Sequence, residues 1–157
     1  MNPPSSLTVG QPVPDFTLAG TGGAFSLAAH AGRPLVLYFY PKDATPGCTT
    51  EAQQFRDLYP EFVAAGCAIY GISRDGLRSH EHFKTKLGLP FELLSDGDET
   101  ACTLFDVIRS KKLYGKEVRG IERSTFLIDG RSILRASWRK VKADGHAAEV
   151  LAAVHAL

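Results

Sequence analysis

Short runs of apolar residues alternate with stretches of helical periodicity through most of the chain, and this alternation limits its possible folds more than any other feature. The run at 35–40 (LVLYFY) is continuously apolar and rich in aromatic and branched residues, which is typical of a strand buried on both faces. The runs and the helical stretches that follow them occupy 35–40 and 46–65, 67–73 and 77–87, and 90–95 and 98–105. This order predicts an α/β fold with a mixed central sheet flanked by helices.

The two ends of the chain carry hairpin signals instead. VPDFTL (13–18) and AFSL (24–27) are separated by GTGG and predict an N-terminal β-hairpin. The segments 123–129 and 132–139 form a second hairpin joined at Asp129-Gly130, and 146–157 is an Ala-rich helix. Residues 109–120 are interpreted as a basic, Gly-containing loop. A length of 157 residues suits one domain, which we expect to cover 1–157.

Composition narrows the class of protein. Apolar residues make up 44% and charged residues 22%, which excludes an intrinsically disordered chain and a disulfide scaffold. A net charge of +1 argues against nucleic-acid binding. Residues 1–102 are acidic overall, whereas 103–145 hold eleven basic and five acidic residues. This basic half is either a solvated surface or a region that binds phosphates or supports a buried anion.

The cellular setting follows from what the sequence lacks. The longest apolar run is far below the roughly 20 residues that span a bilayer, so we expect no membrane association. The N-terminus MNPPSSLTVGQP has neither a basic start nor an apolar stretch, so no signal peptide is recognised. The spacing of the three cysteines matches no zinc pattern. Free thiols favour a reducing, cytoplasmic location.

Chemistry is expected at the turn 41–48, because ligands of such sheets bind beyond the carboxyl ends of the strands. Thr45 followed by Pro46 is a helix start, with Thr suited to the N-cap and Pro to the first helical position. Cys48 is then the third helical residue, where unpaired backbone N–H groups and the helix dipole favour a thiolate. The Thr45 hydroxyl is expected to cap the helix and to bond an oxygen that reaches the sulfur. Pro41 makes the turn rigid and removes a competing donor.

This segment, FYPKDATPGCTTEA (39–52), resembles the active site of peroxiredoxins, specifically the bacterioferritin comigratory protein or peroxiredoxin Q group. The segments GQPVPDFTL, YGIS, LLSD, YGK and GIERSTFLID are also similar to that group, so the resemblance covers nearly the whole chain. It implies a thioredoxin-like fold with an N-terminal β-hairpin. It also implies a thiol-dependent peroxidase that reduces hydrogen peroxide and small organic hydroperoxides and needs no metal or organic cofactor.

The resemblance implies a role for each matching residue. Cys48 is the peroxidatic cysteine, whose thiolate attacks one peroxide oxygen and becomes a sulfenic acid. Pro41 shields the thiolate, Thr45 orients the peroxide and Arg123 supplies a permanent cation. From residue chemistry alone, Glu51 is a possible acceptor either for Arg123 or for the N–H groups at the helix terminus.

The chain departs from the group at the resolving cysteine, which would form a disulfide with the sulfenic acid. The position five residues after Cys48 is Gln53, and the helical stretch 75–87 contains no cysteine. Cys67 is interpreted as an inert core residue, and Cys102 is the one candidate for an unusual resolving role. We therefore expect a one-cysteine mechanism with an external thiol reductant, namely thioredoxin, glutaredoxin or glutathione, in a monomer or weak homodimer.

Other readings of the sequence stay open. A cysteine hydrolase would need a histidine near Cys48, and all five histidines lie outside the turn. A peroxide sensor or oxidation-triggered holdase would oxidise once without efficient turnover.

His80 and His82 are interpreted as solvated helix surface, because i and i+2 residues point to different sides of a helix. Lys42 and Asp43 are interpreted as solvated residues at the rim of the turn.

Overall fold

A seven-stranded mixed sheet forms the centre of the molecule in the computed structural model, which describes residues 7–157. The first six residues, part of the segment in which no signal peptide is recognised, lie outside the described residues. The strands are β1 Thr17–Gly20, β2 Phe25–Ser26, β3 Leu35–Phe39, β4 Ala68–Ser73, β5 Glu92–Ser95, β6 Ile108–Leu113, β7 Lys116–Ile121, β8 Ser124–Ile128 and β9 Leu134–Trp138. The α-helices are α1 Pro46–Ala64, α2 Leu77–Leu87, α3 Thr100–Leu104 and α4 His146–His155, and a short 3-10 helix covers Ala28–His30.

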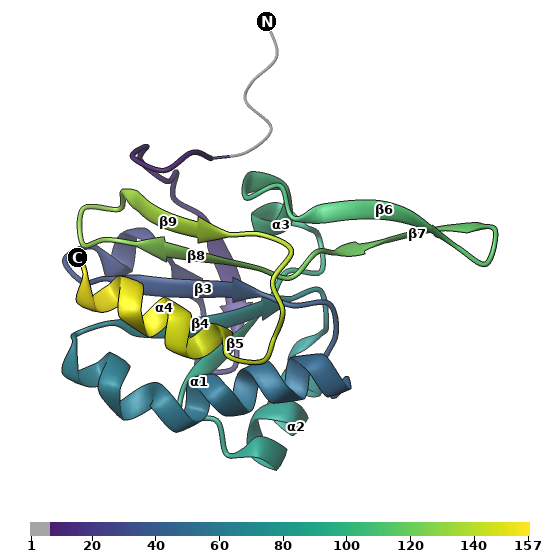
Figure 1. The fold of residues 1–157 in the computed structure, drawn as a ribbon, viewed down its shortest axis with the longest axis horizontal. Coiled ribbons are helices and arrows are strands. Elements are labelled where there is room, and N and C mark those ends of the chain that lie inside the picture. Colours follow the sequence, from purple (N-terminus) through teal and green to yellow (C-terminus); the bar gives the residue numbers. More distant parts are fainter. Residues whose placement is uncertain (1–6) are drawn as a thin grey trace, which may run out of the picture.

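The strand order β2-β1-β5-β4-β3-β8-β9 confirms the predicted mixed α/β architecture (Figure 1). β3, β4 and β5 are parallel, and α1 and α2 connect them, as the alternation of apolar runs and helical stretches predicts. β1–β2 and β8–β9 are the antiparallel hairpins expected at the two ends. The central strand β3 pairs with β4 on one side and β8 on the other, so its carboxyl end lies in the middle of the sheet edge.

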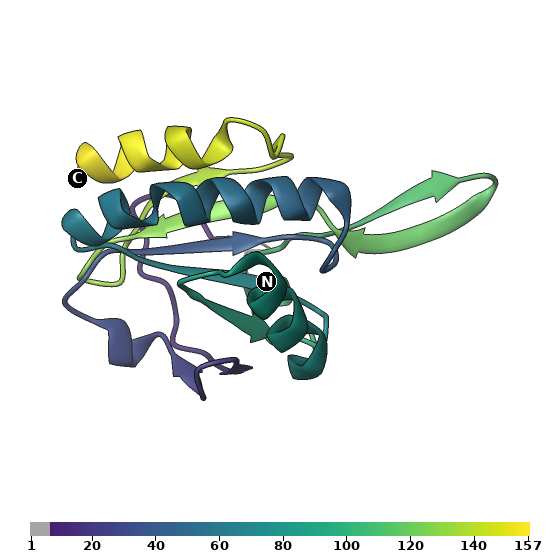
Figure 2. The ribbon, with the colours of Figure 1, turned by 90° about the horizontal axis from the view of Figure 1, so that it is seen from below.

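Apolar side chains pack against both faces of the sheet. Leu35, Leu37 and Phe39 point into one cluster, and Val36 and Tyr38 point into the other, because successive strand residues face opposite sides. The second cluster lies under α1, α2 and α4, and Figure 2 shows α1 and α4 side by side over that face. The first cluster lies under the N-terminal segment and α3. No helix within residues 7–157 is both long and apolar enough to cross a membrane.

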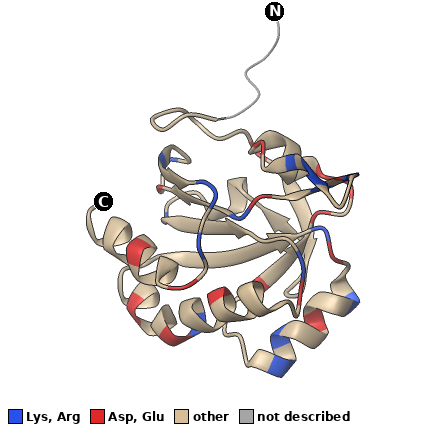
Figure 3. Cartoon of the chain, turned by 45° about the vertical axis from the view of Figure 1, so that its right-hand side comes forward, with Lys and Arg blue, Asp and Glu red and all other residues tan. Residues whose placement is uncertain are grey.

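The prediction of a loop over 109–120 is wrong. β6 and β7 pair there as an antiparallel arm that projects from the body (Figures 1 and 2). The arm buries little surface, and Tyr114 at its tip is 98% exposed. The basic residues of the C-terminal half therefore fall on the arm, on β9 and on the loops around it rather than on one helix face (Figure 3).

The β8–β9 connection, residues 129–133, is longer than the interval between the predicted strands 123–129 and 132–139. Asp129 accepts hydrogen bonds from the backbone N–H groups of Arg131 and Ile133, and Ser132 is the residue in the left-handed region, with φ of +62°. Glycine is required at position 130 for a different reason, because the backbone of Gly32 lies too close to leave room for a side chain. A Cβ at this position would lie 2.9 Å from the carbonyl carbon of Gly32.

Candidate active site

The turn after β3 places Cys48 as the sequence predicts. α1 begins with Pro46 after the extended N-cap Thr45, so Cys48 is the third helical residue. Its side chain is buried, with 1% exposure, at the carboxyl end of the central strand. Pro41 is exposed on the same turn.

The Thr45 hydroxyl does not cap the helix, contrary to the sequence-based expectation. Its Oγ1 donates a 2.8 Å hydrogen bond back to the carbonyl oxygen of Lys42, and the helix N-terminus has no side-chain cap. This bond closes the turn and uses the only hydroxyl hydrogen. The Thr45 oxygen is therefore left as an acceptor rather than a donor.

Arg123 reaches this turn from the residue before β8. Its Nη2 donates to Cys48 Sγ at 3.3 Å and its Nη1 donates to Glu51 Oε1 at 2.6 Å. Gly47 makes room for the guanidinium, since a Cβ there would lie 3.0 Å from Nη2. The structure thus brings together two residues 75 positions apart in the sequence, and it confirms that Glu51 accepts from Arg123.

The charges around the sulfur are held away from solvent. Burial raises the pKa of Glu51 to about 7, although Arg123 opposes this change. Burial also works against the charge on Arg123, but Glu51 and Cys48 outweigh it and raise the pKa of the guanidinium above its ordinary value. Arg123 is consequently a fixed cation beside Cys48 at every pH at which the protein is folded.

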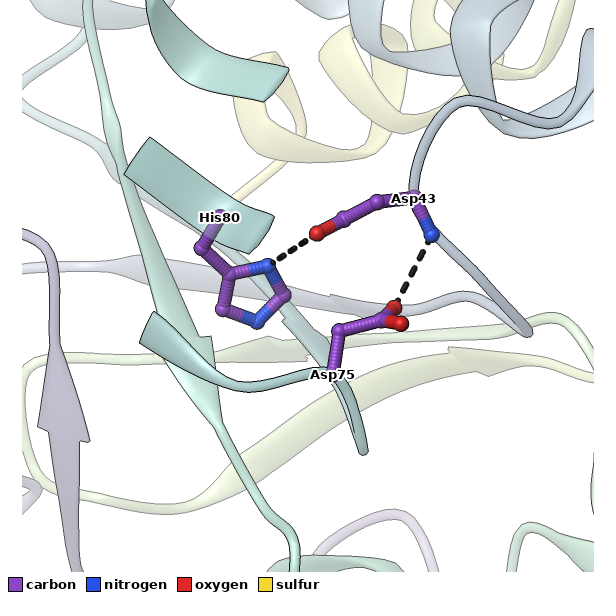
Figure 4. A group of neighbouring side chains, drawn as sticks. All are labelled: Asp43, Asp75 and His80. Atoms are coloured by element: carbon purple, nitrogen blue, oxygen red, sulfur yellow. Dashed lines mark hydrogen bonds and ion pairs between the residues drawn. The ribbon is translucent and has the colours of Figure 1, made fainter. Parts of the chain in front are cut away.

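Asp43 and His80 form a buried pair behind the turn, so the interpretation of both as solvated residues is wrong (Figure 4). Asp43 Oδ2 lies 2.8 Å from His80 Nδ1 and accepts from Ser79, while Oδ1 accepts a 2.6 Å bond from the Tyr40 hydroxyl. Burial opposes ionisation of Asp43, but the bonds from His80, Tyr40 and Ser79 outweigh it and lower its pKa. The carboxylate is therefore ionised at neutral pH.

His80 is hydrogen-bonded at both ring nitrogens in this arrangement. Its Nε2 lies 2.9 Å from the carbonyl oxygen of Leu94, which has no hydrogen to give, so Nε2 must donate. Nδ1 faces the ionised Asp43 and donates as well. The sequence carried a signal for this burial: His80 and the core residue Phe83 lie at i and i+3 on α2, hence on one helix face.

Asp75 completes the cluster by accepting from the backbone N–H of Asp43 and from the Ser73 hydroxyl. The ligand atoms of Asp43, Asp75 and His80 lie within 4.8 Å of one another, a spacing compatible with a metal ion. Both nitrogens of His80 carry hydrogens in hydrogen bonds, however, and a metal ligand must offer a lone pair. The cluster is better described as an ion pair that fastens the turn 41–44 to α2.

The other two cysteines lie away from Cys48. Cys102, on α3, belongs to the apolar cluster on the opposite face of the sheet. Cys67 lies on the same face of the sheet as Cys48, but at the opposite end of the central strands. It precedes Ala68, the first residue of β4, which pairs with Leu35 at the start of β3. The four residue steps from Leu35 to Phe39 along β3 separate the two ends of the strand by about 13 Å, well beyond the ~7 Å that a disulfide spans between Cα atoms. Burial raises the pKa of Cys67 to about 12 and that of Cys102 further still.

A cavity of about 450 Å³ opens beside the turn, between the arm and the loop after β9. Its lining includes Pro41, Arg123, Lys111, Val118 and Lys140. A second cavity, of about 590 Å³, lies along residues 137–149 and has no cysteine in its lining. The first cavity therefore gives access to the edge of the site that contains Pro41 and Arg123.

No histidine bonds Cys48 within residues 7–157. The two buried histidines have other partners: His80 bonds Asp43 and Leu94, and His146 bonds Thr125 and Glu149. The cysteine-hydrolase reading, which needs a histidine as a base beside the thiol, has no support in this geometry.

Comparison with known proteins gives a consistent result. Residues 9–137 match the AhpC/TSA family. The chain is 55% identical over 143 residues to peroxiredoxin Bcp of Xanthomonas campestris, covering 90% of this chain and 89% of that one, and 48% identical over 147 residues to peroxiredoxin Bcp of Bacillus subtilis, covering 93% and 94%. A structure from work on the alkyl peroxide reduction activity of the Xanthomonas campestris bacterioferritin comigratory protein has a TM-score of 0.86 at 54% identity, covering 90% of each chain.

Proposed function

This chain belongs to the AhpC/TSA family as a peroxiredoxin of the bacterioferritin comigratory protein, or peroxiredoxin Q, group, and on that premise we propose that Cys48 is its peroxidatic cysteine. The protein is a thiol peroxidase with a thioredoxin-like fold. The observation that carries the assignment is the 3.3 Å contact between Arg123 Nη2 and Cys48 Sγ in the first turn of α1.

The proposed reaction begins with attack of the Cys48 thiolate on the nearer oxygen of a hydroperoxide. The O–O bond breaks, the sulfur is oxidised to a sulfenic acid, and the far oxygen leaves as water or alcohol after it takes a proton. Arg123 stabilises the negative charge that spreads over sulfur and both oxygens, because it is already positioned and charged before the reaction.

Thr45 and Pro41 position the substrate in this proposal. Because the Thr45 hydrogen is used by Lys42, its oxygen accepts a hydrogen bond from the O–H of the incoming hydroperoxide. This contact would direct the peroxide O–O axis toward the sulfur. Pro41 lines the mouth of the cavity, has no backbone N–H to offer the substrate, and shields the sulfur from water.

We propose that the sulfenic acid is resolved by an external thiol. The placement of Cys102 on the opposite face of the sheet, and of Cys67 about 13 Å away at the other end of β3, supports this one-cysteine mechanism. Thioredoxin, glutaredoxin and glutathione are the candidate reductants. A cytoplasmic location and a monomer or weak homodimer remain parts of the proposal, the former supported by three free thiols.

The test is the intact mass of the fully reduced protein seconds after one equivalent of hydrogen peroxide is added. We expect the wild type to gain one oxygen, the Cys67→Ser control to do the same, and Cys48→Ser to remain unchanged. A loss of two hydrogens that disappears in Cys102→Ser would contradict external resolution. No change in the wild type would contradict the role of Cys48.

A further inference from the structure

The cavity beside Cys48 has the composition of a binding site for a small anionic molecule. Four cations line it, Arg109, Lys111, Arg123 and Lys140, against a single acidic residue, Glu122. A volume of about 450 Å³ lies within the range of sites for small ligands. The arm formed by β6 and β7 makes one wall.

Two of these four cations, Arg109 and Arg123, have hydrogen-bond partners within the protein, whereas Lys111 and Lys140 have no ion-pair partner among the described residues. Arg109 bonds Asp106, and Arg123 bonds Glu51 and Cys48. Lys111 and Lys140 form no ion pair within the part of the chain that the structure describes. Lys111 comes from β6, whereas Lys140 follows β9, so the two ammonium groups belong to different walls.

The register of the arm explains why Lys111 faces the cavity. Lys111 pairs with Val118 and Arg109 with Gly120, and cross-strand partners share a face; all four line the cavity. Lys112 pairs with Glu117 on the opposite face, and neither lines it. The arm thus offers a matched pair of lysines, one inside the cavity and one outside.

The cavity also has an apolar part. Val118, Ile121 and Val141 line it together with Pro41. Val141 is held against the site by its backbone N–H, which donates to the carbonyl oxygen of Arg123. A ligand with an uncharged chain between its carboxylate and its reactive end therefore suits this lining better than a bare inorganic anion.

We propose that this cavity binds a low-molecular-weight thiol that carries carboxylate groups and that this thiol reduces the Cys48 sulfenic acid. The proposal rests on the proposed function and names the class of reductant. Lys111 and Lys140 bind the carboxylates, and the thiol enters past Pro41 toward the sulfur beside Arg123. A small thiol suits this site because Cys48 is buried, and Arg123, which bonds its sulfur, lines the cavity.

The chemistry balances with two molecules of the thiol. The first, RSH, attacks the Cys48 sulfur; an S–S bond forms, the S–O bond breaks, and the oxygen leaves as water with the thiol proton. The second RSH attacks the mixed disulfide, which releases RSSR and restores the Cys48 thiol. The small thiols are oxidised, and the Cys48 sulfur is reduced.

The experiment separates oxidation from resolution. Hydrogen peroxide first converts the protein to its oxygen adduct, and the peroxide is removed. Glutathione, neutral 2-mercaptoethanol or cationic cysteamine is then added, and the loss of the oxygen adduct is timed by quenched intact mass. Wild type, Lys111→Ala, Lys140→Ala, the double variant and the control Lys112→Ala are compared, each normalised to the adduct it formed.

We expect glutathione to react about threefold more slowly in each single variant and about tenfold more slowly in the double variant, the size expected for partly exposed ion pairs. The Lys112→Ala control and the reaction with 2-mercaptoethanol should stay within about twofold of wild type, and cysteamine should react faster in the double variant. Added salt should slow glutathione more in the wild type than in the double variant, which keeps only Arg109 and Arg123 as cavity cations.

The proposal would be overturned if the lysine variants slowed the reaction equally with all three thiols, or if Lys112→Ala slowed it as much. It would also be overturned if the glutathione rates of the lysine variants equalled that of wild type. Failure of the proposed function is distinguishable, because no oxygen adduct would then form before the thiol is added. The same lysines would attract a hydroperoxide that carries a carboxylate. A variant effect confined to oxidation by such a peroxide would assign the cavity to the substrate and overturn its assignment to the reductant.

Discussion

Replacing the buried His80 on α2 with leucine should strongly destabilise the protein. The side chain is fully buried, and both of its nitrogens donate, one to Asp43 at 2.8 Å and one to Leu94 at 2.9 Å. Leucine fills a similar space but leaves the buried Asp43 carboxylate without its histidine partner. The Tyr40 and Ser79 hydroxyls remain as its side-chain donors.

Removal of one partner of a buried ion pair costs about 3–5 kcal/mol, because the other charge stays buried and unpaired. Since a protein of this size has a total stability of about 5–15 kcal/mol, the loss is a large fraction of it. The melting temperature should fall by roughly 6–20 °C. His80→Asn, which keeps one donor near Asp43, should recover part of the loss, whereas the double variant His80→Leu/Asp43→Leu should lose less than the sum of the two single changes.

Urea unfolding of the reduced protein at pH 7 measures these differences, with the slope against urea concentration as a check that the unfolded state is unchanged. The acid limb provides a second check. Asp43 has a lowered pKa in the folded protein, so its stabilisation is present above the ordinary carboxyl pKa of about 4 and is lost as the pH falls through the folded value. The gap between wild type and His80→Leu should therefore narrow below pH 4. A cost under 1 kcal/mol, or strictly additive single changes, would refute the ion pair.

Three further changes probe the site and the fold. Arg123→Met should slow oxidation of Cys48 by hydrogen peroxide by about 10²–10³-fold, measured by quenched intact mass, because it removes the fixed cation at 3.3 Å from the sulfur; a decrease under threefold would rule out that role. The pKa of Glu51 is raised to about 7, so protonation of Glu51 stabilises the fold below about pH 4.5, and this contribution of about 3 kcal/mol is lost as the pH rises through 7. Glu51→Gln should flatten that part of the curve of stability against pH, and an unchanged curve would contradict the raised pKa. Gly130→Ala should cost about 1–3 kcal/mol in urea unfolding because its Cβ meets the backbone of Gly32, and a neutral result would show that the loop shifts freely.

The order of the central elements was predictable because their residues are apolar on the faces that become buried. β3, β4 and β5 lie within the short apolar runs, of which only 35–40 is continuously apolar. α1 and α2 end next to Gly66 and Gly88, both in the left-handed region with φ of +73° and +62°. The burial of these apolar residues determines how the helices and the sheet stack. The same residues produce the hydrophobic periodicity in the sequence, so the periodicity predicts the elements. The Cys48 helix start was predictable for a local reason, since Thr45 and Pro46 act through the backbone next to them.

The arm was missed because it has almost no buried face. IRSKKL and KEVRGI carry charges on both sides of the ribbon, so neither strand shows the apolar alternation by which half-buried strands are recognised. Tyr114 and Gly115, both at positive φ, form the two-residue hairpin turn of the arm. The flanking residues are mostly basic, so the turn was not recognised as joining two strands. The Asp43–His80 pair was missed for a different reason, because a polar side chain is buried only when tertiary structure supplies its partners, here from the turn after β3 and from α2 and β5.

The same ion pair bears on the missing resolving cysteine. A thiol on α2 could reach Cys48 only if the helix or the turn moved, and His80 fastens α2 both to the turn through Asp43 and to β5 through Leu94. Opening these contacts breaks both hydrogen bonds of the buried His80 side chain. Residues 77–87 contain no cysteine, so such a movement would bring no thiol to the sulfur. A reductant that enters through the cavity between the arm and Lys140 meets Cys48 from the side of Arg123 instead, without breaking the ion pair. Loosening the pair with His80→Asn should therefore leave the ratio of glutathione to 2-mercaptoethanol rates unchanged, whereas Lys111→Ala should lower it.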